Sequence, residues 1–190
     1  MKHANLIVSY SLALLFFFRP SSIANLAQRK KHTKGMIHYV LLQNRHGKAR
    51  LTKWYVPCDD ADKEAQKKDI HRLLASRETL VASASAGVQR GPLTANFVEY
   101  RSIKLVYRRY AGLYFIFAVD LADNELSYLE LIQLFVEILD SFFGNVNELD
   151  IVFGFHKVYM VLDEMFLAGE IQEVSQQAIL QRVAALDTLK

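Results

Sequence analysis

The chain has 190 residues, of which 52% are hydrophobic and 23% are charged, a composition typical of a globular protein that can bury a core. Its formal net charge of +3 is unevenly placed, because the first 35 residues hold six of the basic side chains and no acidic one. The rest of the chain therefore carries about three excess negative charges, which removes the main electrostatic support for binding nucleic acid.

The first 35 residues differ in character from the rest. Residues Leu6 to Phe18 form an apolar run that is short for a membrane span but typical of a signal-peptide core, and Ser22 to Ala24 resembles a cleavage site. The stronger basic cluster, however, follows this run instead of preceding it. We therefore expect residues 1–35 to be an N-terminal extension, either signal-like or the product of a start assigned too far upstream, with the functional chain beginning at Met36.

From Met36 the alternation of apolar and polar residues predicts two strands followed by a helix. Asn44 and Gly47 supply the permissive backbone positions of the turn between the strands. Asp59 and Asp60 provide the cap and a first-turn acid of the helix. The expected bounds are 36–43 and 49–56 for the strands and 59–77 for the helix.

The remaining chain predicts a loop, three strands and three helices. The loop covers 80–95, which is rich in small residues and shows no periodicity, and we interpret it as an insertion. Short links between strands favour an α+β domain, in which a five-stranded antiparallel sheet is packed with helices. Gly144 and Gly169 are the expected C-terminal caps of the first two helices. The strands are expected at 96–102, 103–110 and 113–121, and the helices at 124–144, 147–170 and 173–186.

The helix expected over 147–170 has few polar positions. A helix that is apolar on nearly every side is usually buried on every side. A domain of this size has difficulty covering such a helix alone, so we expect a partner protein to cover part of it.

No catalytic pattern is present in the sequence. It has no Gly-rich phosphate loop, its six histidines lack metal-ligand spacing, and a single cysteine, Cys58, cannot form a zinc site or an internal disulfide. Asp163 and Glu164 are adjacent on a helix and so point in different directions. We therefore expect no enzyme activity and no cofactor or metal.

Four segments are more specific than these patterns: "QNRHGKARLTKWY", "NFVEYRSIKLVYRRYAGLYF", "DNELSYLELIQLFVEIL" and "NELDIVFGFHKVYMVLDEMFLAGEIQE". Together they resemble the small, sigma chain of a clathrin adaptor heterotetramer, from Met36 to the C-terminus except near 80–95. "YRRYAGLYF" and "LDEMFLAGE" resemble the plasma-membrane endocytic form. The resemblance implies a longin-like fold and a non-enzymatic subunit that stabilises the adaptor core. It also implies a location on the cytosolic face of the plasma membrane at clathrin-coated pits.

The resemblance also implies partners and a binding site. The partners are a large adaptin chain, the other adaptor subunits, and cytosolic tails of membrane cargo that carry acidic dileucine signals, with clathrin and membrane contacted indirectly. Arg50 would face the acidic residue of the signal, while Arg108 and Arg109 would lie on the rim of the site or pack on the large chain. The leucine pockets would be lined by Ala111, Leu113, Val136, Asn145, Val146 and Ile151.

Two other functions remain open from the sequence. A longin-type subunit of a trans-Golgi adaptor or another vesicle coat would share the fold and have a mainly structural role. A secreted or membrane-anchored protein would require residues 1–35 to act as a signal or anchor.

Overall fold

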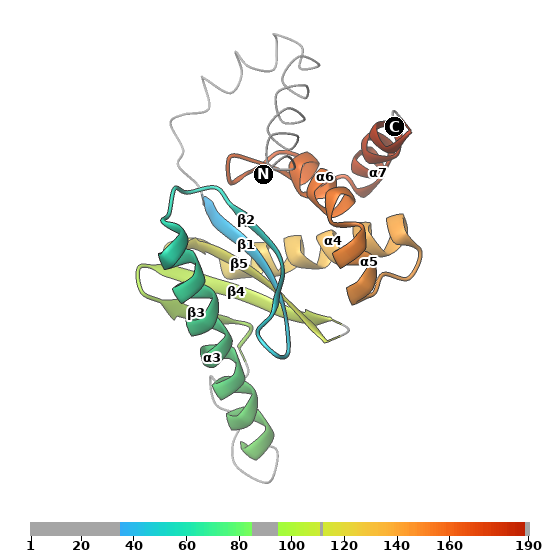
Figure 1. The fold of residues 1–190 in the computed structure, drawn as a ribbon. Coiled ribbons are helices and arrows are strands. Elements are labelled where there is room, and N and C mark those ends of the chain that lie inside the picture. Colours follow the sequence, from blue (N-terminus) through green and yellow to red (C-terminus); the bar gives the residue numbers. More distant parts are fainter. Residues whose placement is uncertain (1–34, 85–94, 111, 189–190) are drawn as a thin grey trace. The chain divides into compact units, whose positions relative to one another are not determined.

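The central feature of the fold is one five-stranded sheet. The computed structural model describes residues 35–84, 95–110 and 112–188. The sheet has the order β2-β1-β5-β4-β3, and every neighbouring pair of strands is antiparallel (Figure 1). The predicted α+β class and the five-stranded antiparallel sheet are therefore confirmed. The strands are β1 (Ile37–Asn44), β2 (Ala49–Trp54), β3 (Phe97–Tyr100), β4 (Ile103–Tyr110) and β5 (Leu113–Asp120).

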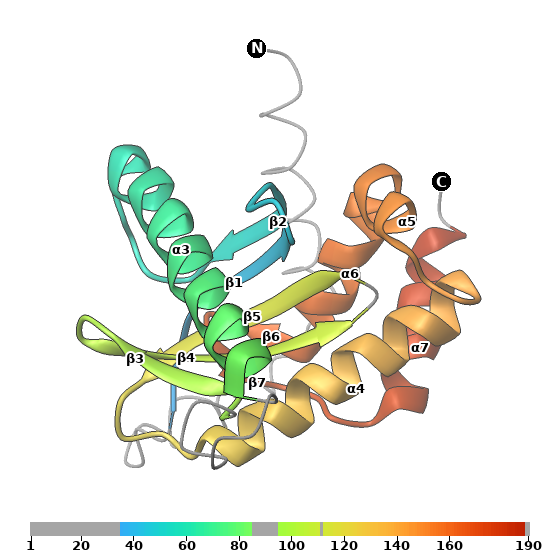
Figure 2. The same cartoon turned by 90° about the horizontal axis from the view of Figure 1, so that it is seen from below.

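The sheet is covered on both faces, since alternate side chains of a strand point to opposite faces. In β1, Tyr39 and Leu41 pack with helix α3 (Asp60–Ala84), whereas Val40 and Leu42 pack with the C-terminal helices on the other face. Figure 2 shows α3 lying across the sheet, apart from α4 to α7. The other helices are α4 (Glu125–Phe143), α5 (Glu148–Phe153), α6 (Phe155–Met165) and α7 (Gln176–Asp187).

Helix α4 has both ends defined by local hydrogen bonds. The Asn124 side chain accepts from the backbone N–H of Leu126, which satisfies a donor that lacks a partner in the helix. At the other end Gly144 has a left-handed backbone (φ 67°) and donates to the Asp140 carbonyl. The predicted C-terminal cap at Gly144 is confirmed.

The prediction of a single helix over 147–170 is wrong. It is broken at Gly154 into α5 and α6, and helix α6 ends at Met165. Asn147 and Asp150 form a reciprocal capping box that begins α5. A Cβ atom at Gly154 would lie 2.7 Å from the Asp150 carbonyl oxygen and 2.7 Å from the Phe143 ring, so the break needs glycine.

The predicted helix cap at Gly169 is also wrong, because this glycine lies in a small hairpin. Strand β6 (Phe166–Leu167) pairs with β7 (Glu170–Ile171), and the turn residues Ala168 and Gly169 both have positive φ, 51° and 82°. Two successive residues of positive φ suit a tight hairpin turn, and glycine adopts that backbone without strain. The Gly169 carbonyl accepts from the backbone N–H of Ile37 at 2.9 Å, which attaches the hairpin to the start of β1.

Helix α3 is longer than predicted. It continues to Ala84, so the first residues of the segment interpreted as a loop over 80–95 are helical. Residues 85–94 and 1–34 lie outside the described residues, so neither the rest of the insertion nor the N-terminal extension is tested. Within the described ranges, no helix is long and apolar enough to cross a membrane.

Candidate functional site

Arg50 lies on β2 and is held by an acidic side chain from α5. Its Nη2 and Nε atoms lie 2.5 Å and 2.6 Å from Oε1 of Glu148, the first residue of α5. The Arg50 side chain is 21% exposed and that of Glu148 is 31% exposed. The guanidinium is therefore within reach of solvent, but it already has a carboxylate partner.

Asn44 completes this polar cluster. Its Nδ2 atom donates to the same Oε1 of Glu148 at 3.3 Å, and its Oδ1 atom accepts from the backbone N–H groups of His46 and Lys48 at 3.0 Å each. The side chain of Asn44 is thus fixed by the turn between β1 and β2. Glu148 is consequently held by two side chains from the sheet, Asn44 and Arg50.

A surface cavity of about 280 Å³ opens beside this cluster. Its lining includes the exposed side chains of Arg45 and His46 together with the acidic side chain of Glu148. An anionic group in this cavity would meet both the Arg45 guanidinium and the Glu148 carboxylate. The cavity is lined by Asn44, Arg45, His46, Gly112 and Glu148.

The predicted leucine-binding residues come from several elements but share one hydrophobic cluster. Leu113 on β5 and Ile151 on α5 are buried in it, only 2% and 1% exposed. Val136 on α4 and Val146, which lies between α4 and α5, are partly buried and pack against it. Neither the cavity above nor the one described below is lined by these four side chains. Leu113 and Ile151 thus lie inside this cluster, and Val136 and Val146 lie at its edge.

Asn145 lies in the connection between α4 and α5. Its backbone has a positive φ of 74°, a conformation that asparagine tolerates better than most residues. The Asp140 carbonyl accepts from its N–H group at 3.3 Å, and the Asp140 carboxylate accepts from that of Val146 at 3.1 Å. The connection is therefore fixed by Asp140. Ala111 lies outside the described residues.

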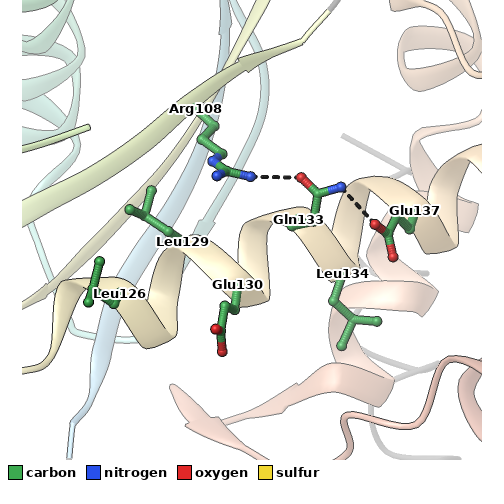
Figure 3. A pocket seen from close by; sticks show the side chains of 7 residues that line it. All are labelled: Arg108, Leu126, Leu129, Glu130, Gln133, Leu134 and Glu137. Carbon is green, nitrogen blue, oxygen red and sulfur yellow. Dashed lines mark hydrogen bonds between the residues drawn. The ribbon is translucent and has the colours of Figure 1, made fainter. Parts of the chain in front are cut away.

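The two arginines near the end of β4 point to opposite faces of the sheet. Arg109 binds Glu78 of α3, with Nη1 and Oε1 2.8 Å apart. On the other face the Nη1 atom of Arg108 donates to Gln133 of α4 at 2.7 Å (Figure 3). Over these positions β4 extends past its pairing with β3, which ends at Val106. Both guanidinium groups therefore have partners within the domain.

Figure 3 shows the shallow cavity of about 470 Å³ in which Arg108 takes part. Gln133 connects Arg108 to Glu137 through a second hydrogen bond of 2.7 Å from Nε2. Acidic and leucine side chains of α4 make up the rest of its lining, and none of the predicted leucine-binding residues belongs to it. The lining residues are Arg108, Leu126, Leu129, Glu130, Gln133, Leu134 and Glu137.

The sequence interpretation missed Glu148 as the partner of Arg50, and Asn44 as the second side chain that holds Glu148. Asn44 was assigned only to a turn, and Glu148 only to a helix. The capping sequence "NELD" indicates a helix start that places an acidic side chain in the first turn. It does not indicate which basic residue that side chain meets.

These features define a class of protein. A five-stranded antiparallel sheet lies between helix α3 on one face and helices α4 to α7 on the other. Within the described residues, no group of histidine, cysteine or acidic side chains is arranged to hold a metal ion. The chain is an α+β domain built on one central antiparallel sheet.

The sequence profile of the clathrin adaptor complex small chain matches residues 36–190, and the chain belongs to that family. Its members are non-enzymatic, as expected from the sequence. The chain is 56% identical to the AP-2 complex subunit sigma of Neurospora crassa over 155 residues, which cover 82% of this chain and all of that protein. It is 45% identical to the AP-1 complex subunit sigma-1 of Arabidopsis thaliana, covering 81% of this chain and 88% of that one.

A structural neighbour has the same fold. It is a chain from a homology model of the full-length AP-3 complex in a stretched open conformation. The two superpose with a TM-score of 0.58 at 33% sequence identity, over 81% of this chain and 95% of the neighbour.

Proposed function

We propose that the chain is the small subunit of a plasma-membrane clathrin adaptor, in which it stabilises the adaptor core and binds acidic dileucine signals of membrane cargo. Relatives named AP-2 complex subunit sigma are 56% identical in Neurospora crassa and 53% identical in Dictyostelium discoideum, and in each case nearly the whole relative is matched. This similarity supports the endocytic assignment. It also supports a location on the cytosolic face of the plasma membrane at coated pits.

The observation that carries the cargo-binding proposal is the closeness of Arg50 to the apolar part of the site. Asn44, which shares the Glu148 carboxylate with Arg50, is paired with Leu113 in the register of β1 and β5. Ile151 follows Glu148 on the same short helix. A peptide with an acidic residue four positions before Leu-Leu could thus contact Arg50 and the apolar residues at once.

Exposed apolar side chains near α5 support the proposal that a partner protein covers this surface. Leu149 is 63% exposed, Phe153 77% and Phe155 46%. Exposed aromatic groups of this kind mark surfaces that a partner covers. A large adaptin chain and the other adaptor subunits are the proposed partners, with clathrin and the membrane contacted indirectly. Arg108 and Arg109 would lie at the rim of the signal site or pack on the large chain.

The test is peptide binding by the full chain, purified together with the subunits that accompany it from the native cell. Ala111→Trp should fill the leucine pocket and abolish binding of an acidic dileucine peptide, while the companion subunits still co-purify. Ser127→Trp places the same side chain at an exposed position of α4 and should leave binding unchanged. Unaltered peptide affinity in the Ala111→Trp complex would refute cargo binding at this site.

A second function deserves a direct test, because relatives from other adaptors are also similar. The AP-1 complex subunit sigma-2 of Arabidopsis thaliana is 49% identical to the chain. A small subunit of a trans-Golgi adaptor or of another coat, with a mainly structural role, is therefore the alternative. Identification of the companion large chain and microscopy of the tagged protein distinguish the two. Location at the trans-Golgi network with retained assembly would favour the alternative.

A further inference from the structure

The side chain that occupies Arg50 has the same chemistry as the residue that Arg50 is proposed to recognise. All three contacts of Glu148 with Asn44 and Arg50 fall on one oxygen, Oε1. No other hydrogen bond or ion pair of this carboxylate is formed within the part of the chain that the structure describes. Glu148 therefore holds the guanidinium in the way an acidic residue of a bound peptide would.

We infer that Glu148 is a built-in competitor that sets the affinity and selectivity of the site for acidic peptides. This inference rests on the proposed function. An arriving carboxylate would enter the cavity beside Arg50, whose lining includes Arg45, His46 and Glu148. Two carboxylates at one guanidinium repel each other, so Glu148 must yield at least part of Arg50 before the peptide can bind fully.

The partial exposure of the pair makes this exchange feasible. A fully buried pair would leave an uncompensated charge in the interior when broken, at a large energetic cost. Here Glu148 is 31% exposed and can turn to water when it releases Arg50. The side chain of Asn44 is fixed by the turn and can donate to either carboxylate.

Glu148 also affects how strongly the site prefers acidic over neutral peptides. A peptide that has glutamine in place of its acidic residue cannot replace Glu148 as a counter-ion of Arg50. It must therefore bind through its leucines while the internal ion pair stays closed. Glu148 consequently lowers the preference of the site for acidic over neutral peptides, because it competes with the acidic peptide alone.

The test uses the full chain with its co-purified subunits and two synthetic peptides. The first peptide has glutamate four positions before Leu-Leu, and the second has glutamine in that place. Glu148→Gln should bind the acidic peptide about three- to tenfold more tightly than the wild-type chain, the range expected for removing a partly exposed competing charge. The gain should be confined to the acidic peptide, and it should vanish in the double variant Arg50→Gln/Glu148→Gln.

Asp163→Asn is the matched control. Asp163 is an exposed carboxylate of α6 that pairs with Lys53 on the same strand as Arg50. Its neutralisation should leave the affinity for both peptides unchanged. Melting temperatures of all variants separate loss of folding from change of binding.

The possible outcomes separate this inference from the proposed function. Binding of the acidic peptide to the wild-type chain with no gain in Glu148→Gln overturns the competitor and leaves the proposed function standing. An equal gain for both peptides also overturns it, because the effect would then not pass through Arg50. Failure of wild-type and Glu148→Gln chains alike to bind either peptide overturns both.

Discussion

Replacing Arg50 by alanine should affect peptide binding more than folding. The Arg50 and Glu148 side chains are 21% and 31% exposed, so water screens their attraction in part. A pair of this kind contributes about 1 kcal/mol to the free energy of unfolding. For a domain of this size, a loss of about 1 kcal/mol lowers the melting temperature by about 2 to 4 °C.

The effect of Arg50→Ala on binding follows from the loss of one charge-assisted contact. Such a contact is worth about 1 to 2 kcal/mol, which corresponds to a loss of about five- to thirtyfold in affinity for an acidic dileucine peptide. If Glu148 competes for Arg50, the measured loss should lie toward the lower end of this range. The difference in peptide affinity between the wild-type chain and Arg50→Ala should shrink in about 1 M salt, where the screening length falls to about 3 Å.

Calorimetric titration and thermal unfolding on the same samples test this prediction. Arg72→Ala is a suitable control, because Arg72 forms an exposed ion pair with Asp69 on α3, which packs on the opposite face of the sheet from α5. Arg72→Ala should change neither the peptide affinity nor the melting temperature appreciably. If Arg50→Ala lowers the melting temperature as expected while the peptide affinity stays the same at low salt, Arg50 has a structural role only.

Three further predictions concern the pocket wall, the core and the N-terminus. Val136→Asp places a carboxylate in a partly buried apolar wall and should reduce peptide affinity by at least about tenfold, measured with the melting temperature on the same complex. Tyr39→Phe should stabilise the fold by about 1 kcal/mol in thermal unfolding, since the buried Tyr39 hydroxyl has no hydrogen-bond partner among the described residues. Burial also raises the pKa of Tyr39, so the unfolded chain loses this proton first and stability falls as pH rises above about 10, less steeply in the variant. The mass of the native protein should correspond to a start at Met36, whereas a processed N-terminus at Asn25 would contradict this.

The sheet was the part of the fold most accessible to prediction. The bounds predicted for β4, 103–110, are those observed, because a run of β-branched and aromatic residues between two tight connections leaves few alternatives. The break at Gly154 was missed because the apolar pattern continues on both sides of it. The position needs glycine because a Cβ atom there would meet the Phe143 ring and the Asp150 carbonyl, and the approach of the Phe143 ring depends on tertiary structure.

The candidate site was predictable to a smaller extent. Arg50 and the leucine-binding residues came from a family resemblance and not from their spacing. Glu148 lies 98 positions from Arg50 in the sequence, and no local pattern connects the two. The ion pair forms only when β2 and α5 pack together, so it can be recognised only in the three-dimensional structure.

The short helix α5 gives the ion pair a second consequence. The bond between Arg50 and Glu148 joins α5 to the sheet, and Ile151 of the same six-residue helix is buried in the hydrophobic cluster that contains Leu113. Under the proposed function, an acidic residue that draws Arg50 away from Glu148 also loosens the helix that covers the place where the leucines must enter. The two halves of the signal would then bind with positive coupling, each lowering the free-energy cost of the other, although no side chain contacts both. A peptide cut into its acidic and its dileucine parts would lose more affinity than the separate contacts account for.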